Sequence, residues 1–506
     1  MKQVAVILGF CALTSAFRVQ SQETHAHPPP EKLGTVSFAT SCAPGVSHDF
    51  VRSVALLHSF AYSAAEQSFR NVAAADPDCA MAHWGIAMSH YHQLWSAPSS
   101  KEIGDAQVEL EQAGRLNGSP RERLFIAAAA AYFKDADRVA PQARAKAYAQ
   151  VMDELARSNP NDTEVQVFYA LSLIATASPQ DATHANQKRA AAILEPIYRD
   201  QPDHPGAAHY LIHTYDSAEL APRGLAAARA YSKIAPSAPH ALHMPSHIFT
   251  RLGLWDDSID SNQAARAAAH QQGDLSEELH AMDYLTYAYL QRGKDTDAAQ
   301  VVAALREMGA SAGPGGDFKV GYAATVMPIR LAVERHAWSD VADMMPLQNS
   351  APFESAIIFW ARAIASSRSG QARAADADIA KIGAYREELR AAGNAYWATQ
   401  VDILEKEAKA WQLAAKQPAK SVQLLRSAAD EEDAVEKSPA TPGPIVPARE
   451  QLGELMLQQH HPKEALAEFQ TALAAAPGRR GALRGGAKAA DLVGDTHTAS
   501  QMRAKL

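Results

Sequence analysis

The sequence is poor in cysteine, in aromatic residues and in net positive charge. The chain of 506 residues contains 3 Cys, and 7% of its residues are aromatic. It has 48 Lys and Arg residues and 56 Asp and Glu residues. The resulting net charge of −8 provides no basic stripe of the kind that nucleic-acid binding requires. We therefore expect no nucleic-acid partner.

Several catalytic motifs are also missing. The chain has no His-Glu-x-x-His motif, which excludes an ordinary zinc protease, and it lacks the phosphate-binding loop and the dinucleotide fingerprint. It has no Cys-x-x-Cys pair for haem attachment or thiol redox work. Any catalysis is therefore expected to use the histidines described below.

The N-terminus has the pattern of a secretory signal. Lys2 is followed by an apolar run at 4–13 and by three small residues at 14–16. We expect a signal peptide at 1–22 and export to the periplasm or out of the cell. No later segment reaches about eighteen uninterrupted apolar residues, so the mature chain is not expected to span a membrane.

Two cysteines remain after removal of this signal. In an exported chain Cys42 and Cys79 are free to form a disulfide, because disulfides persist in oxidising compartments. The alternative is a pair of buried thiols, a common environment for cysteine.

Alanine is abundant, as in the run 127–131, and it favours helices over strands. The fold class is therefore predicted to be all-α. An internal repeat supports this prediction. Its clearest unit, 446–479, carries Gly453, Phe469 and Pro477 at the spacing of a helical hairpin.

The spacing of small residues, aromatics and prolines resembles the tetratricopeptide repeat, a helix–turn–helix of about 34 residues. Pro202 and Pro236 are one such repeat apart and close similar units. The resemblance implies a curved solenoid of stacked hairpins with a concave groove. The stretches 97–144 and 311–438 fit the repeat poorly.

The predicted organisation has five parts, with Gly- and Pro-rich breaks near 311 and 438. They are a signal peptide at 1–22, a flexible leader at 23–45, an N-terminal repeat array carrying the histidines at 46–310, an irregular helical-repeat region at 311–437, and a C-terminal pair of repeats at 438–506.

Histidines recur at equivalent places in adjacent repeats. If the repeats start at Pro205 and Pro239, His209 and His213 take positions 5 and 9 of the first, and His243 and His247 take the same positions of the second. Residues four apart share a helix face, and equivalent positions of stacked repeats are neighbours. The resemblance implies that these positions face the groove.

Position 2 carries histidine in the next two repeats, as His240 and His280, and Asp283 follows at position 5 of the later one. Two histidines four residues apart can bind one metal ion, and a neighbouring helix can add ligands. We predict a site for Zn, Cu or Fe. Its ligands are taken to be His209, His213, His243, His247 and His280.

Two features limit this prediction. Pro245 lies between His243 and His247, and a helix that starts at this proline would leave His243 in the preceding loop. The histidines can also be read as groove residues that only form hydrogen bonds or contact a peptide. His58 and His92 would reach the cluster only if the solenoid curls round.

Two carboxylates are candidates for a catalytic acid or base. Asp283 continues the row of histidines, and Glu450 takes position 5 of the C-terminal repeat. The alternative for Glu450 is a solvated carboxylate.

The leading functional hypothesis is an exported tetratricopeptide-like metalloprotein with a histidine-lined groove. If it is an enzyme, a metal with three protein ligands and an open position would make it a hydrolase, whereas copper or iron would make it an oxidoreductase. The alternative is a non-enzymatic scaffold of the cell envelope that binds a peptide, a protein or a small molecule, or a purely structural component without a ligand.

Overall fold

The computed structural model describes residues 31–308 and 317–506. Within these ranges every regular element is a helix and none is a strand, which confirms the all-α prediction. The predicted signal peptide and most of the leader before residue 31 lie outside the described residues. None of the described helices combines the length and the apolarity needed to cross a bilayer.

The helices follow one another with short connections. In chain order they are η1 Pro44–Val46, α1 Ser47–His58, α2 Tyr62–Ala75, α3 Ala80–Ser89, α4 Ser100–Arg115, α5 Pro120–Phe133, α6 Pro141–Ser158, α7 Thr163–Ala175, α8 Ala185–Asp200, α9 Pro205–Thr214, α10 Ala221–Ile234, α11 Pro239–His243, α12 Pro245–Arg251, α13 Trp255–Gln272, α14 Leu275–Gln291, α15 Asp295–Met308, α16 Phe318–Glu334, η3 Trp338–Asp340, α17 Pro352–Arg368, η4 Ala372–Ala374, α18 Ala375–Ala391, α19 Ala395–Leu413, α20 Pro418–Asp433, α21 Ala448–Gln458, α22 Pro462–Ala475, α23 Arg480–Val493 and α24 Thr496–Arg503.

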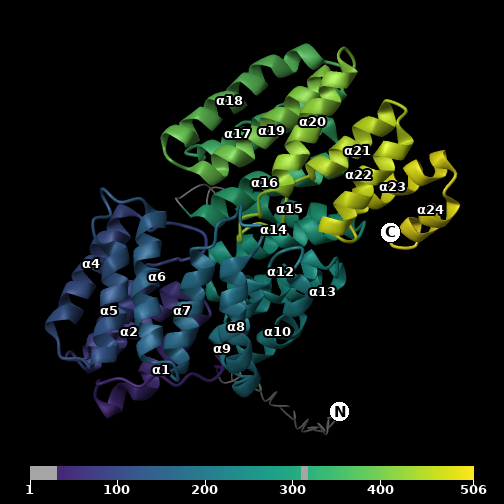
Figure 1. Cartoon of the computed structure of the whole chain (residues 1–506). Helices are drawn as coiled ribbons and strands as arrows, with labels where there is room; N and C mark the ends of the chain where they lie inside the picture. Colours follow the sequence, from purple (N-terminus) through teal and green to yellow (C-terminus); the bar gives the residue numbers. More distant parts are fainter. Residues whose placement is uncertain (1–30, 309–316) are drawn as a thin grey trace, which may run out of the picture. The chain divides into compact units, whose positions relative to one another are not determined.

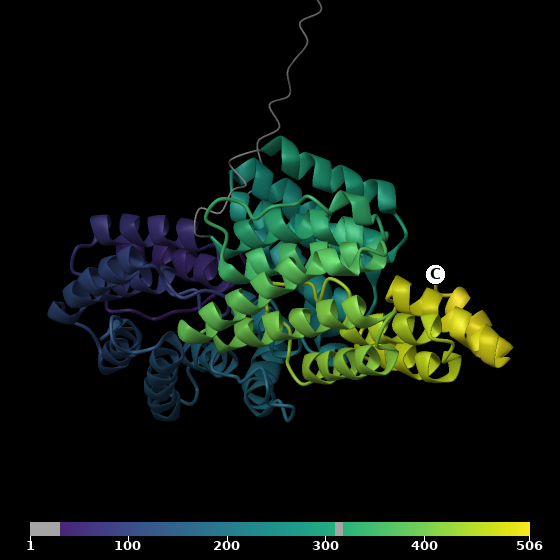
Figure 2. The ribbon, with the colours of Figure 1, turned by 90° about the horizontal axis from the view of Figure 1, so that it is seen from above.

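Neighbouring helices pack as hairpins, each turning back along the one before it (Figures 1 and 2). Helix α13 lies against α14, α17 against α18, and α21 against α22. The regions that fit the repeat poorly are built in the same way, since α5 packs on α6 and α19 on α20. The contacts join residues 32–506 into one unit.

Glycines let the two helices of a hairpin approach closely. A Cβ atom on Gly85 in α3 would lie 2.4 Å from the ring of Phe69 in α2, and one on Gly453 in α21 would lie 2.9 Å from the ring of Phe469 in α22. Such distances exclude any side chain without movement of the ring. Small residues thus allow the close approach of the paired helices.

Prolines lie just beyond the second helix of several hairpins. Helix α8 ends at Asp200 and α10 at Ile234, so Pro202 and Pro236 both lie in the turn that follows. Proline lacks an amide hydrogen and clashes with the preceding turn, so it stops the helix there.

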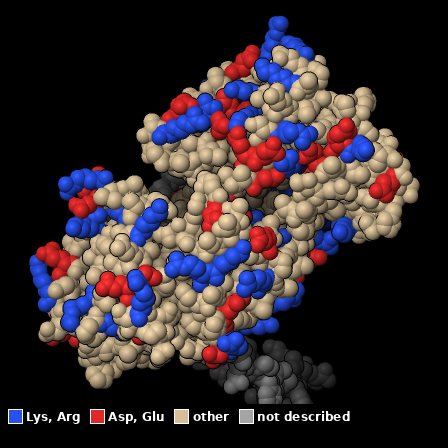
Figure 3. All heavy atoms as spheres, viewed as in Figure 1, with Lys and Arg blue, Asp and Glu red and all other residues tan. Residues whose placement is uncertain are grey.

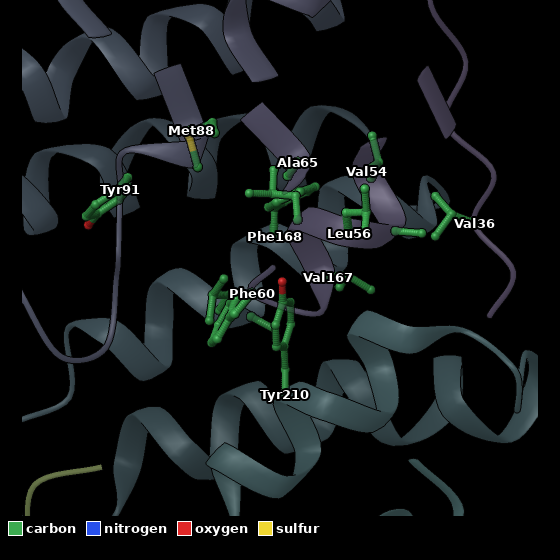
Figure 4. Close-up of a cluster of buried hydrophobic side chains, with 14 of the residues drawn as sticks. Val36, Val54, Leu56, Phe60, Ala65, Met88, Tyr91, Val167, Phe168 and Tyr210 are labelled. Carbon is green, nitrogen blue, oxygen red and sulfur yellow. The ribbon is translucent and has the colours of Figure 1, made fainter. Parts of the chain in front are cut away.

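Residues 32–43, which we assigned to a flexible leader, are packed against the helices in an extended conformation. The amide of Thr35 donates to the carbonyl oxygen of Asp203 at 2.9 Å. Val36 and Val54 of α1 both belong to the hydrophobic cluster drawn in Figure 4. A disulfide joins Cys42 at the end of this segment to Cys79 before α3. Apolar residues within 32–43 therefore belong to the core.

The surface carries mixed charge. On the face drawn in Figure 3, Lys and Arg side chains alternate with Asp and Glu side chains and form no extended patch of one sign. The mixture of positive and negative side chains on this face agrees with the modest net charge of −8.

Candidate metal centre

Helix α9 carries the first two predicted ligands. His209 and His213 are one turn apart and both are buried. The Nδ1 atom of His209 lies 2.6 Å from the backbone carbonyl oxygen of His58. A carbonyl oxygen can only accept a hydrogen bond, so Nδ1 of His209 carries the proton and its Nε2 atom presents a lone pair.

His240, at the start of α11, completes this group although we had not placed it among the ligands. One ring nitrogen from each of His209, His213 and His240 lies within 4.8 Å of the other two. The Nδ1 atom of His240 lies 3.0 Å from Oε2 of Glu277, which fixes its proton in the same way. We call these three residues group A.

The Nε2 atoms of group A are buried without a hydrogen-bond partner among the described residues. Buried polar atoms in native proteins nearly always have a partner, so three unpaired nitrogens in one cluster of histidines require an explanation. A metal ion is the partner that such lone pairs suit. The residues present therefore fit a metal.

A second group, which we call group B, consists of His243, His247 and His280. Helix α12 does begin at Pro245, but Met244 before it keeps helical dihedral angles, so α11 and α12 hold His243 and His247 on one side. Their Nε2 atoms are 3.0 Å apart. The proline therefore interrupts the helix without separating the pair.

The protons of this pair are also fixed from outside. Nδ1 of His243 lies 2.6 Å from Oδ1 of Asn262, whose amide nitrogen donates to the carbonyl oxygen of Ser258. Nδ1 of His247 lies 2.9 Å from Oδ2 of Asp216. With both Nδ1 atoms protonated, two Nε2 lone pairs face each other at 3.0 Å, which is repulsive unless a cation lies between them.

A proton is a poor candidate for that cation. Burial lowers the pKa of His247 to about 4, and it lowers the pKa of the other members of both groups below the ordinary histidine value. The six imidazoles are therefore neutral at pH 7, with lone pairs available to a metal.

One carboxylate supports each group. Asp216 accepts from His247 and is held by Lys437 at 2.8 Å and by Arg251 at 2.9 Å. Burial raises the pKa of Asp216, but these two cations outweigh burial and keep it well below its usual range. Both carboxylates are thus anionic supports, since Glu277 accepts from His240 and pairs with Lys319.

A nearby group of similar composition differs in its bonding. His58 and His204 share the carboxylate of Glu164, at 2.8 Å and 3.1 Å. Their other ring nitrogens bond to Tyr210 and to the amide of Ala207. Every ring nitrogen is satisfied, so this group is explained by hydrogen bonds alone. His58 reaches the centre only through its carbonyl oxygen.

The remaining predicted residues lie elsewhere. His92 packs against the ring of Tyr62, with centroids 4.3 Å apart. Asp283 is buried with its Oδ1 atom 3.7 Å from Nε of Arg330, and burial raises its pKa to about 6. Glu450 is not the solvated carboxylate of our alternative, because it is buried in a two-point ion pair with Arg479.

Group A borders a cavity of about 410 Å³. His213 and Asp216 contribute to its wall together with Trp95, Trp397 and Lys437. On another side the ring of Phe60 covers His209, with centroids 4.4 Å apart. Phe60 thus covers group A at His209, and the cavity borders the group at His213.

The hairpins, the glycine–aromatic contacts and the prolines after the second helices form a consistent pattern. The fold is tetratricopeptide-like.

No family model and no curated protein matches the sequence. Solved structures similar to the chain include human IFIT1 with m7Gppp-AAAA, at 12% identity over 84% of this chain and 89% of that chain with a TM-score of 0.39. Yeast Tom70 is 10% identical over 89% of this chain and 90% of that chain, with a TM-score of 0.30. The TPR domain of P58(IPK) is 12% identical over 89% of this chain and 99% of that chain, with a TM-score of 0.22. Such values carry no function across.

Proposed function

We propose that the protein is an exported, tetratricopeptide-like metalloprotein that binds transition-metal ions through groups A and B. The observation that carries this proposal is the set of unpaired, buried Nε2 atoms in group A. Their Nδ1 protons are fixed by acceptors at two of the three residues, as is common for histidines that bind metals.

The site has the composition of a metal-dependent enzyme. Three protein ligands leave an open coordination position, and the cavity beside His213 gives a small molecule access to it. With zinc the chemistry would be hydrolytic, and with copper or iron it would be redox chemistry. Asp283 lies 3.7 Å from Arg330 and Glu450 is ion-paired with Arg479, and neither carboxylate belongs to group A or group B.

Export is supported by two features. The sequence at 1–22 has the pattern of a signal peptide. Cys42 and Cys79 form a disulfide, a bond that persists in oxidising compartments.

The test is elemental analysis of the protein purified without a polyhistidine tag and dialysed against a weak chelator. Two double variants are compared with it, His209→Ala with His213→Ala, and His243→Ala with His247→Ala. We expect stoichiometric Zn, Cu or Fe in the parent protein and a loss of part of it in each variant.

The matched control replaces His460 and His461, two exposed neighbours in the turn before α22, by alanine. It should keep the full metal content, and circular dichroism should show that all variants remain helical. Absence of stoichiometric metal from the parent protein would refute the proposal.

A scaffold that binds a peptide or protein partner is the second candidate, and the tetratricopeptide-like fold favours it. A scaffold predicts that chelation leaves the thermal midpoint unchanged. A metal bound only to the folded state predicts a lower midpoint after chelation.

A further inference from the structure

Groups A and B are adjacent in space. The ring centroids of His213 and His247 are 5.8 Å apart, and those of His240 and His243 are 5.9 Å apart. Within a group the ring centroids are 4.2–6.4 Å apart. The two groups are therefore as close to each other as their own members are.

We propose that the two groups form one dinuclear copper centre that binds dioxygen between its ions. This inference rests on the proposed function, since it specifies the metal and the reaction of the same site. It adds that the ions act as a pair, as in two-metal sites where the ions are about 3.5–4 Å apart.

The repeat architecture explains why there are two equivalent groups. Each combines positions 5 and 9 of one repeat with position 2 of the next, as His209 and His213 with His240, and then His243 and His247 with His280. Stacking of equivalent hairpins places equivalent groups side by side. A pair of similar ions in similar environments is the expected result.

The charge of the site favours copper. All six donors of groups A and B are neutral imidazoles, so the ligands themselves bring no negative charge. Two Cu(I) ions bring half the charge of two Zn(II) ions into this buried volume, and uncompensated buried charge is costly. The supporting carboxylates are already balanced, Asp216 by Lys437 and Glu277 by Lys319. Imidazole is a good ligand for copper, whereas manganese and magnesium prefer oxygen donors.

Uptake of dioxygen leaves the net charge of the pair unchanged. Each Cu(I) ion gives one electron to dioxygen, which becomes a peroxide dianion bound between two Cu(II) ions. The step needs no proton and no further reductant. The bridging dianion offsets the added charge of the oxidised ions, which the six neutral ligands cannot do.

An aromatic ring and a tyrosine hydroxyl lie against the histidines, and a cavity borders them at His213. Phe60 lies against three members of group A, with ring centroids 4.4–5.7 Å from His209, His213 and His240. The hydroxyl of Tyr284 lies 3.4 Å from Nε2 of His247 and donates to the carbonyl oxygen of Thr441. The cavity beside His213 is the entry route.

The experiment loads the full mature chain with Cu(I) under argon and then admits air-saturated buffer. We expect two copper ions per chain, uptake of one dioxygen molecule per two copper ions, and an intense near-ultraviolet absorption band from the bound peroxide. The oxidised protein should give almost no electron paramagnetic resonance signal, because the spins of two bridged Cu(II) ions cancel.

The key variant is His280→Ala, which removes one ligand from group B and leaves group A complete. It should take up no dioxygen, and after chemical oxidation its remaining copper should give a full paramagnetic signal. His280→Gln is a second variant in case the alanine variant loses its helical circular dichroism. His461→Ala, at the exposed turn, should behave as the parent protein does.

The other possible outcomes distinguish the dinuclear inference from the proposed function. If the oxidised parent protein holds two copper ions that both give a full electron paramagnetic resonance signal, and takes up no dioxygen, the dinuclear inference is overturned and the proposed function stays intact. Zinc retained in preference to copper in a competition experiment would overturn the choice of metal. A parent protein that binds no metal stoichiometrically would overturn both proposals.

Discussion

At the residue scale, the carboxylate of Asp216 determines which ring nitrogen of His247 carries the proton and which presents a lone pair. Asp216 accepts the Nδ1 proton of His247 and is itself fixed by Lys437 and Arg251. The carboxylate therefore fixes both the tautomer and the orientation of His247. In metalloproteins, residues that support a metal ligand in this way contribute measurably to the affinity for the metal.

We predict that Asp216→Asn weakens metal binding by about 10–100-fold. The amide has no charge to stabilise an Nδ1 proton, and it leaves two cations close to a metal site. Competition with a chromophoric chelator measures the affinity. The matched control is Glu109→Gln, since Glu109 binds Nδ1 of His83 at 2.6 Å outside both groups. Equal affinities in the two variants would contradict the supporting role of Asp216.

Glu164 makes stability depend on pH. Burial raises its pKa, but hydrogen bonds from His204 and His58 outweigh burial and lower the pKa to about 2, against an ordinary value of 4.5. Its stabilising contribution is complete above the ordinary value and is lost as the pH falls towards the folded value. That difference corresponds to about 3 kcal/mol.

We therefore predict that Glu164→Gln lowers the thermal midpoint at about pH 6 and reduces the further fall between about pH 5 and pH 3. Thermal unfolding followed by circular dichroism measures both quantities. Glu464→Gln, at an exposed position of α22, should keep the parent profile. A parallel downward shift of the Glu164→Gln curve at every pH would show that its charge is not the cause.

At the element scale, the hairpins and the histidine rows could be predicted because both follow the period of the repeat. Positions 5 and 9 are visible as His209 and His213, and again as His243 and His247. His240 was available at position 2, the place that His280 holds one repeat later. His240 was not among the predicted ligands, and its place beside His209 and His213 follows from the stacking of the hairpins.

Other contacts leave no periodic trace. Asp216 lies in the turn after α9, and its partner Lys437 lies beyond α20, 221 residues further along the chain. The extended segment at 32–43 resembles a leader in composition, yet Phe38 packs against Phe50 and Phe125. Tertiary contacts of irregular segments determine both cases, and sequence patterns do not encode such contacts locally.

The close approach of α2 and α3 gives a test of hairpin packing. We predict that Gly85→Ala destabilises the protein by about 1–3 kcal/mol, because the new Cβ would lie 2.4 Å from the ring of Phe69. Gly104→Ala, within α4, is the matched control, since its Cβ would meet no atom within 4 Å. The control should gain up to about 1 kcal/mol from helix propensity. The thermal midpoint should fall in Gly85→Ala and rise in Gly104→Ala relative to the parent protein. Equal shifts in the two variants would refute the packing argument.

At the scale of the whole molecule, segments distant in sequence meet around the centre. The connection from α20 to α21 returns to the histidine-bearing helices, where Glu436 pairs with Arg251 and Lys437 with Asp216. The carbonyl oxygen of Thr441 accepts from the hydroxyl of Tyr284. The Gly- and Pro-rich break expected near 438 lies in this connection, and through Thr441 it contacts α14 beside group B. The C-terminal half therefore contributes to the environment of a candidate site whose histidines all come from the N-terminal half.

Arg479, just before α23, ties the C-terminal hairpins to the central helices. Its buried guanidinium donates to Glu450 of α21 at 3.0 Å and to Glu334 of α16 at 2.5 Å. We predict that Arg479→Met costs about 3–5 kcal/mol at pH 7, because two buried carboxylates lose their cation. The thermal midpoint should fall by several degrees, and limited proteolysis should release the C-terminal hairpins first.

The pH dependence of unfolding shows whether the loss of stability in Arg479→Met comes from the missing charge. Burial already raises the pKa of Glu450, and without Arg479 this carboxylate would take up a proton more readily. The difference in free energy of unfolding between variant and parent should therefore narrow from pH 7 to about pH 5. Arg503→Met, which removes an exposed ion pair with Asp491, should change stability by less than about 0.5 kcal/mol. A gap that stays constant with pH would mean that Arg479 acts through packing of its side chain and not through its charge.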